Sequence, residues 1–190
     1  MKKKKSEFDL SYSDSHTERF AITQSFIKKY VQNSDRILDI GPLNPFSRIL
    51  ASQGYQVDNT PEDVDLDLHP EITLQQEYDI VTAFEIFEHL VSPFPILKDV
   101  KSNLLIASVP LKLWFSDAYW NDQDPYDRHY HEFEPKQFDM LLEKAGWKII
   151  DQKKWKSYSR FKIGVRPILR KFTDRYYLVV CERNNKNSWK

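Results

Sequence analysis

The 190-residue sequence predicts an α/β fold of three layers, in which helices cover both faces of a mostly parallel sheet. Three observations carry this prediction. Short apolar segments of strand length alternate with segments of helical periodicity. A glycine turn and a helix start directly follow the first of these strands. No repeat or linker divides the chain, and its 41% hydrophobic residues are enough for one core.

A strand, a glycine turn and a capped helix follow one another in the stretch RILDIGPLNPFSRIL. Its apolar residues at 36–40 predict a buried strand, and Gly41 predicts the turn that ends it. Asn is a strong N-cap and Pro is preferred at the first helical position, so Asn44 and Pro45 predict a helix start. Gly54 supplies the C-terminal cap. Such a unit places a backbone turn and a helix N-terminus where a bound cofactor can sit.

The other elements follow from the same two periodicities. Strict alternation predicts a strand at 64–68, and apolar runs predict buried strands at 78–84 and 104–109. Gly146 ends the helix that Pro135 starts. The expected helices are 16–32, 45–53, 93–102 and 135–145, and the expected strands are 36–40, 55–59, 64–68, 78–84, 104–109, 147–150 and 176–181.

Composition excludes several classes of protein. The formal net charge is zero, so bulk electrostatics predict no nucleic-acid or membrane partner. No apolar run is long enough for a transmembrane helix, and the N-terminal lysines lack the apolar core of a signal peptide. We expect a disordered basic start at 1–14 and one domain at 15–190. The single cysteine, Cys181, excludes an internal disulfide and a cysteine-based zinc site, and it indicates a reducing, cytoplasmic location.

The charges are unevenly distributed along the chain. Residues 49–97 contain ten Asp or Glu and no Lys or Arg, whereas residues 148–175 contain ten Lys or Arg and two Asp. The second region includes a basic insert at 151–175 between the last two expected strands. Two interpretations stay open. In the first, the acidic and basic regions form two charged faces that keep the protein soluble. In the second, the acidic face suits a cationic ligand and the basic face suits an anionic substrate.

Three further segments point to one family. They are YDIVTAFEIFEHLVSP at 78–93, with its Glu-His-Leu motif, LLIASVP at 104–110 and HYHEFEPKQFDMLLEKAGWKIID at 129–151. With the strand–glycine–helix unit, they resemble the class I S-adenosylmethionine-dependent methyltransferases of the small-molecule type, over residues 36–151. The resemblance implies a three-layer Rossmann-like methyltransferase fold with an antiparallel last strand. It also implies an enzyme that uses S-adenosylmethionine, whose sulfonium suits the acidic region.

The resemblance assigns the methionine end of the cofactor to the first turn. Asp39 and Gly41 match the family motif there: a carboxylate suits the ammonium group, and glycine lets the backbone come close. Pro42 follows in the same turn. Only one glycine of the family's usual two or three is present in this turn. Phe84 and Glu85 fall at the end of a strand that lines the cofactor in the family.

The adenosine end of the cofactor is assigned to acidic residues between positions 58 and 67. The acid that holds the ribose hydroxyls in the family is displaced here, and Glu62 is the first choice, with Asp58 in reserve. Asp65 or Asp67 matches the acid that meets the adenine amine. Asp67 is favoured because it leads directly into Leu68.

Histidines supply the candidate catalytic groups. His129 and His131 would share one face of an extended segment, and His89 stands in the Glu-His-Leu motif. Histidine titrates near neutrality and can take a proton from an acceptor hydroxyl or amine. Glu88 is a reserve base. Alternatively, the histidines fix the loop to the domain, or His129 and His131 bind a metal with an acid; no metal is predicted.

The acceptor side is assigned to the aromatic loop at 111–133 and to the basic insert. Trp114, Trp120 and Tyr126 would cover a small-molecule acceptor, and Arg166 would bind its phosphate or carboxylate. Two alternatives stay open: a cofactor-binding protein without catalysis, and an RNA methyltransferase that uses the insert. A nucleic-acid partner is not favoured, because the chain is neutral and lacks an Asn/Asp-Pro-Pro-aromatic motif. The sequence makes no prediction of oligomeric state.

Overall fold

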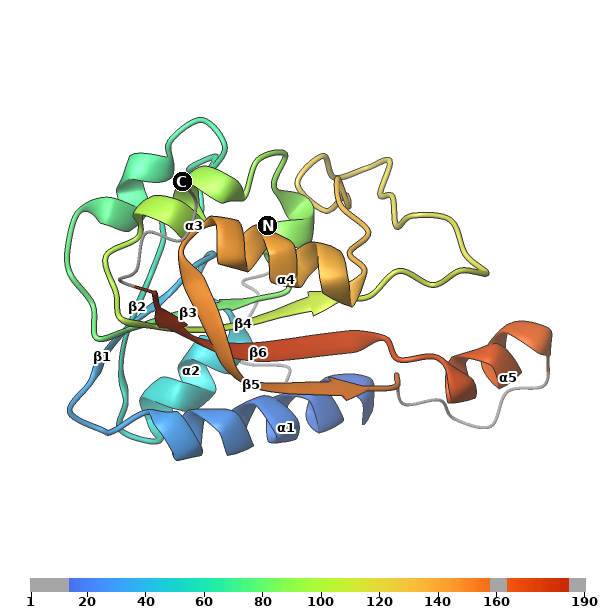
Figure 1. Cartoon of the computed structure of the whole chain (residues 1–190), viewed down its shortest axis with the longest axis horizontal. Coiled ribbons are helices and arrows are strands. Elements are labelled where there is room, and N and C mark those ends of the chain that lie inside the picture. The colour runs from blue at the N-terminus through green and yellow to red at the C-terminus, as the bar shows by residue number, and fades with distance from the viewer. Residues whose placement is uncertain (1–13, 158–163, 185–190) are drawn as a thin grey trace, which may run out of the picture.

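The computed structural model describes residues 14–157 and 164–184. The segment predicted to be disordered, residues 1–14, lies outside the described residues except for Asp14, where the first helix begins. Residues 158–163 of the predicted insert also lie outside them. The described residues form one sheet with helices on both faces (Figure 1).

Six strands make up the sheet, in the order β2-β1-β3-β4-β6-β5. They are β1 (Arg36–Asp39), β2 (Gln56–Asn59), β3 (Ile80–Phe84), β4 (Leu104–Pro110), β5 (Trp147–Trp155) and β6 (Tyr176–Arg183). β1 pairs in parallel with β2 and β3, and β3 pairs in parallel with β4. β6 runs antiparallel to both β4 and β5. The predicted mostly parallel sheet with an antiparallel last strand is confirmed.

Helices cover the two faces of the sheet. α1 and α2 lie on one face, and α3 and α4 lie on the other (Figure 1). The helices are α1 (Asp14–Tyr30), α2 (Pro45–Ser52), α3 (Phe94–Asp99), α4 (Pro135–Lys144) and α5 (Val165–Phe172), with 3₁₀ turns η1 (Pro70–Leu74) and η2 (Phe87–His89). No helix in these ranges is long and apolar enough to cross a membrane.

Two apolar cores result from the alternation of side chains along the central strands. Ile80 and Ile106 face α1 and α2, whereas their neighbours Val81 and Leu105 face α3 and α4. All four are buried. Strands that bury both faces in this way are typical of a parallel sheet between two helical layers, so the expected fold class is confirmed.

The expected strand at 64–68 is wrong. This segment forms a turn between β2 and η1. The Asp65 carboxylate accepts a hydrogen bond from the backbone N–H of Asp67, 2.9 Å away, while Leu66 is buried in the core. Short acidic side chains can accept hydrogen bonds from nearby backbone N–H groups and so compete with the hydrogen bonds of a strand. A turn therefore accommodates the same alternation of acidic and apolar residues.

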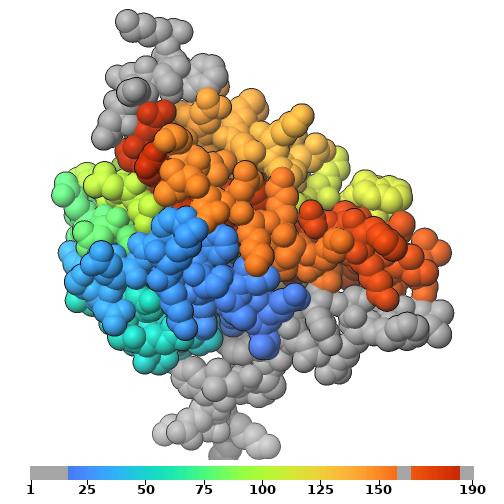
Figure 2. Space-filling view, turned by 60° about the horizontal axis from the view of Figure 1, so that its bottom comes forward, coloured from blue at the N-terminus to red at the C-terminus, as the bar shows by residue number. Residues whose placement is uncertain are grey.

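The expected strand at 147–150 is too short, because β5 continues to Trp155. Its continuation is tied to α1: the Asp151 carboxylate accepts hydrogen bonds from Lys29 and from the Tyr30 hydroxyl, both at 2.7 Å. Figure 2 shows α1 (blue) beside β5 (orange) on this face. The first residues of the predicted basic insert are therefore part of the sheet.

Candidate functional site

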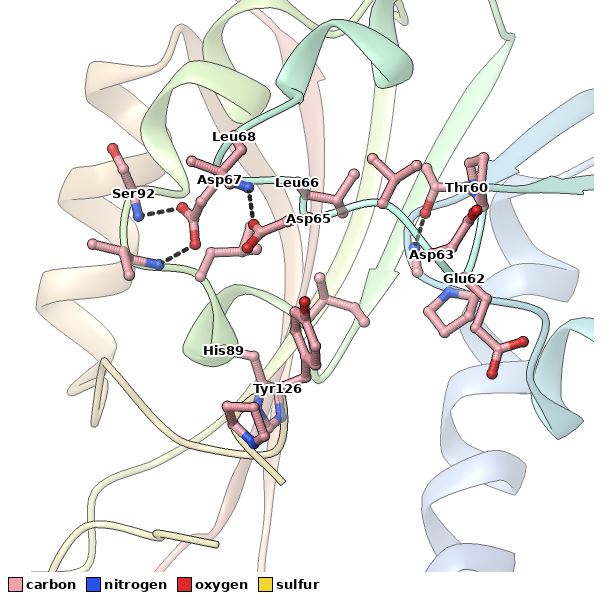
Figure 3. Close-up of a pocket in the computed structure, with 18 of the residues that line it drawn as sticks. Thr60, Glu62, Asp63, Asp65, Leu66, Asp67, Leu68, His89, Ser92 and Tyr126 are labelled. Atoms are coloured by element: carbon pink, nitrogen blue, oxygen red, sulfur yellow. Dashed lines mark hydrogen bonds between the residues drawn. The ribbon is translucent and has the colours of Figure 1, made fainter. Parts of the chain in front are cut away.

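A cavity of about 830 Å³ opens where β1, β2 and β3 end (Figure 3). Ligands bind at the carboxyl ends of the strands in open α/β sheets, and this volume is in the usual range for a small-molecule site. Its wall is made by Gly41 and Pro42, residues 60–68, Ile86, residues 89–92, Pro125, Tyr126 and Tyr130. Seven of these residues are ones that the sequence assigned to the site: Gly41, Pro42, Glu62, Asp65, Asp67, His89 and Tyr126.

The turn between β1 and α2 requires its glycine. Gly41 has a φ of 116°, in the region that side chains disfavour, and its N–H donates to the Thr60 hydroxyl at 2.9 Å. A Cβ at Gly41 would lie 2.8 Å from a methyl carbon of Ile86. The predicted helix start is confirmed, since the Asn44 side chain accepts hydrogen bonds from Phe46 N and Ser47 N.

Asp39 stabilises this turn through hydrogen bonds of its buried carboxylate. Its carboxylate is 1% exposed and accepts hydrogen bonds from Thr82 Oγ1 at 2.7 Å, Ser47 Oγ at 2.8 Å and Asn44 Nδ2 at 2.9 Å. Burial raises the pKa of Asp39, and these hydrogen bonds oppose that rise. Asp39 lines neither this cavity nor the smaller one beside it. Any effect of Asp39 on a ligand therefore acts through the turn.

Residues 60–68, here called the acidic loop, lie along one side of the cavity, with His89 and Tyr126 below them in Figure 3. The two oxygens of Asp67 accept hydrogen bonds from Val91 N and Ser92 N, both at 2.8 Å. Asp67 therefore joins the acidic loop to the segment after η2. Glu62 is exposed at the cavity edge, whereas the reserve residue Asp58 lies on β2 outside it.

A second cavity of about 340 Å³ adjoins the first, because Pro42 and Ile86 line both. Phe84 and Glu85 lie in its wall, at the end of β3. The Glu85 carboxylate accepts a hydrogen bond from Ser108 at 2.7 Å and lies 3.4 Å from the Arg19 guanidinium.

The sequence did not predict several residues of the two cavity walls. Arg19 and its neighbours on α1, Phe20 and Thr23, were missed because no local pattern links α1 to the end of β3. Thr60 was also missed, although its place directly after β2 is a usable signal.

His89 and His129 come together across 40 positions of sequence. Their rings lie 5.0 Å apart, edge to face. The Nδ1 of His89 lies 3.1 Å from the carbonyl oxygen of Arg128, and the Nδ1 of His129 lies 2.9 Å from Glu132 Oε1. Burial and the neighbouring His129 lower the pKa of His89, so its ring is neutral at neutral pH.

Glu88 lies beneath this pair and is 1% exposed. Its Oε1 is 3.7 Å from Nε2 of His89. Its Oε2 has no hydrogen-bond partner within residues 14–157 and 164–184. Burial and the nearby charge of Glu85 hold the pKa of Glu88 well above its usual value.

The other predicted residues lie outside both cavities. The His131 imidazole stacks on Phe133, and its Nε2 donates to the Val91 carbonyl at 3.2 Å. Trp114 and Trp120 are exposed in the aromatic loop, and Trp120 lies under the Arg128 guanidinium. Arg166 is exposed on α5, which extends away from the sheet (Figure 1). Tyr126 is therefore the one predicted acceptor residue in a cavity wall.

Comparison with solved structures supports the fold. An S-adenosylmethionine-dependent methyltransferase from Methanosarcina mazei aligns with a TM-score of 0.59 at 14% identity, over 83% of this chain and 96% of that one. Magnesium protoporphyrin IX methyltransferase from Synechocystis, solved with S-adenosylhomocysteine, aligns with a TM-score of 0.58 at 14% identity, over 94% and 89%. A 1,6-didemethyltoxoflavin-N1-methyltransferase from Burkholderia thailandensis, solved with its substrate and S-adenosylhomocysteine, aligns with a TM-score of 0.51 at 14% identity, over 94% of each chain.

A search of the curated proteins finds no match. The family model described as "Methyltransferase domain" matches residues 14–152, which run from the start of α1 into β5. The match spans most of the chain and includes every strand end around the larger cavity. Since sequence family and fold agree, the protein belongs to the methyltransferase domain family, as its resemblance to the class I S-adenosylmethionine-dependent enzymes predicted.

Proposed function

We propose that the protein transfers a methyl group from S-adenosylmethionine to a small-molecule acceptor. The observation that carries this proposal is the cavity of about 830 Å³ between the Gly41 turn and the acidic loop. The two structurally similar enzymes solved with S-adenosylhomocysteine support the choice of cofactor, and the molecules in their names, magnesium protoporphyrin IX and 1,6-didemethyltoxoflavin, support a small acceptor.

The cofactor is proposed to lie along the cavity from the turn to the acidic loop. Gly41 and Pro42 approach its methionine end, and Glu62 meets the ribose hydroxyls. Asp65 is better placed than Asp67 for the adenine amine, because Asp67 already uses both oxygens to bind backbone N–H groups. Phe84 and Glu85 line the adjoining second cavity and are proposed to border the methionine end of the cofactor.

The chemistry needs alignment more than it needs reactive side chains. A lone pair of the acceptor attacks the methyl carbon, the carbon–sulfur bond breaks, and its electron pair stays on sulfur to give S-adenosylhomocysteine. The acceptor's proton leaves to a base or to water. The sulfonium is already activated, so holding the two reactants in line supplies much of the acceleration. His89 is the candidate base that lines the cavity.

The acceptor is proposed to be small and anionic. The acceptor would share the larger cavity of about 830 Å³ with the cofactor, beside His89 and Tyr126, which leaves room for a compact molecule only. Arg166 and the basic region around it stay candidates for its acidic group, and Trp114 and Trp120 stay candidates for a cover over it. These assignments are testable once an acceptor is known, because Arg166→Ala, Trp114→Ala and Trp120→Ala should each change KM for that acceptor and leave cofactor affinity unchanged.

Calorimetric titration with S-adenosylhomocysteine is expected to show one binding site per chain, together with a rise in Tm. ATP serves as the control ligand, because it carries adenosine but lacks the homocysteine end that the Gly41 turn would meet. Binding that is specific to S-adenosylhomocysteine supports the proposed cofactor. No heat and no thermal shift at millimolar S-adenosylhomocysteine would contradict it.

His129→Ala is expected to lower turnover by about 10²–10⁴, the usual cost of losing a base, because the His129 ring packs against the ring of the candidate base His89. S-adenosylhomocysteine affinity should stay within about twofold, since His129 lies outside both cavities. The measurement is release of S-adenosylhomocysteine with a panel of small hydroxyl, amine and carboxylate acceptors. His131→Ala, measured in parallel, shows whether the second predicted histidine takes part. Full turnover in both variants would rule out a catalytic role for this pair.

A further inference from the structure

A buried carboxylate oxygen without a partner stands next to two histidines. Glu88 Oε2 accepts no hydrogen bond within the described residues, and Glu88 is 1% exposed. A buried polar atom without a partner destabilises the fold, and more so if it is charged. A proton or a cation can satisfy this oxygen. One potential ligand atom from each of Glu88, His89 and His129 lies within 4.8 Å of the other two.

Both imidazoles are oriented as metal ligands usually are. The Arg128 carbonyl can only accept, so Nδ1 of His89 carries the hydrogen, and Nε2 keeps its lone pair. The Glu132 carboxylate likewise accepts a hydrogen bond from Nδ1 of His129, so Nε2 of His129 also keeps its lone pair. A carbonyl or carboxylate partner on the second nitrogen is typical of histidines that bind metals, because it fixes the tautomer and raises the basicity of the ligating nitrogen.

We propose that Glu88, His89 and His129 bind one divalent transition-metal ion. Two imidazoles and one carboxylate suit Zn²⁺ or Mn²⁺, whereas Mg²⁺ and Ca²⁺ prefer oxygen ligands. Glu85 is not a ligand here, since its two oxygens face Ser108 and Arg19. The sequence left open a different metal site, made of His129, His131 and an acid. The structure does not place His131 in this cluster, since its Nε2 lies 3.2 Å from the Val91 carbonyl oxygen.

The ion would lie at the wall of the larger cavity, because His89 lines that cavity. In this arrangement His89 binds the ion instead of acting as the base. Three protein ligands leave at least one coordination position for a ligand oxygen. This part of the inference rests on the proposed function: the open position would take a hydroxyl, phenolate or carboxylate oxygen of the acceptor. A bound cation lowers the pKa of a hydroxyl, so the acceptor oxygen would be a better nucleophile at neutral pH.

The test is calorimetric titration of untagged, chelator-treated protein with ZnCl₂ and with MnCl₂, in the absence of any cofactor. One ion per chain is expected. Glu88→Gln, His89→Ala and His129→Ala are each expected to weaken binding by at least about tenfold. Glu88→Gln keeps the shape of the buried side chain, so an unchanged Tm separates loss of a ligand from loss of the fold.

His131→Ala is the matched control, because it removes a histidine from the same loop that lies outside the cluster. It should bind the ion as the wild type does. The proposed site would be overturned if the wild type does not bind one ion per chain. It would also be overturned if Glu88→Gln, His89→Ala and His129→Ala bind the ion as tightly as His131→Ala does. S-adenosylhomocysteine titration is performed separately, so failure of metal binding and failure of the proposed cofactor give different results.

Discussion

Gly41→Ala is expected to weaken S-adenosylhomocysteine binding by about 10- to 100-fold. The left-handed backbone at φ 116° costs a non-glycine residue about 1–3 kcal/mol. The added Cβ would also lie 2.8 Å from Ile86, whose side chain lines both cavities. To relieve that contact, the turn or Ile86 must move into the space proposed for the cofactor, so the loss appears in affinity as well as in stability.

Gly54→Ala is the matched control for this variant. Gly54 also has a positive φ, of 92°, but its added Cβ would meet only Asn33 at 3.8 Å, an ordinary contact. Backbone strain should therefore lower Tm in both variants, and further in Gly41→Ala because of the Ile86 contact, whereas only Gly41→Ala should lose affinity in calorimetry. Equal affinities would show that the Gly41 turn does not contact the cofactor.

Asp39→Ala is expected to lower the free energy of unfolding by about 3 kcal/mol, because it leaves buried donors on Thr82 and Ser47 without their acceptor. The same change should weaken S-adenosylhomocysteine binding by about 1.5–3 kcal/mol, since Asn44 and the turn lose their anchor. Urea denaturation measures the first effect and calorimetry the second.

Asp58→Ala provides the comparison on the adjacent strand. Its carboxylate is exposed and pairs with Arg36 at 3.4 Å, and such surface ion pairs contribute about 0–1 kcal/mol. A loss of stability in Asp58→Ala as large as in Asp39→Ala would show that the buried network around Asp39 has no special role.

The fold could be predicted to a large extent because it depends on local patterns. The Asn44 cap and the apolar strand at 36–40 are both determined by residues within one turn or one strand of each other. The wrong strand at 64–68 marks the limit of such reasoning. Alternation of acidic and apolar residues suits a strand and a turn equally, and contacts of Asp67 with the segment after η2 decided between them.

The sequence by itself determined which strand ends could form a cofactor cavity, because Gly41 and the acidic loop directly follow β1 and β2 along the chain. Only the tertiary structure decided what stands beside that cavity. Packing brings His129 against His89 and places Arg19 of α1 next to Glu85. These contacts join residues 40 or more positions apart, and their geometry depends on how helices and loops pack on the sheet, which no local periodicity specifies.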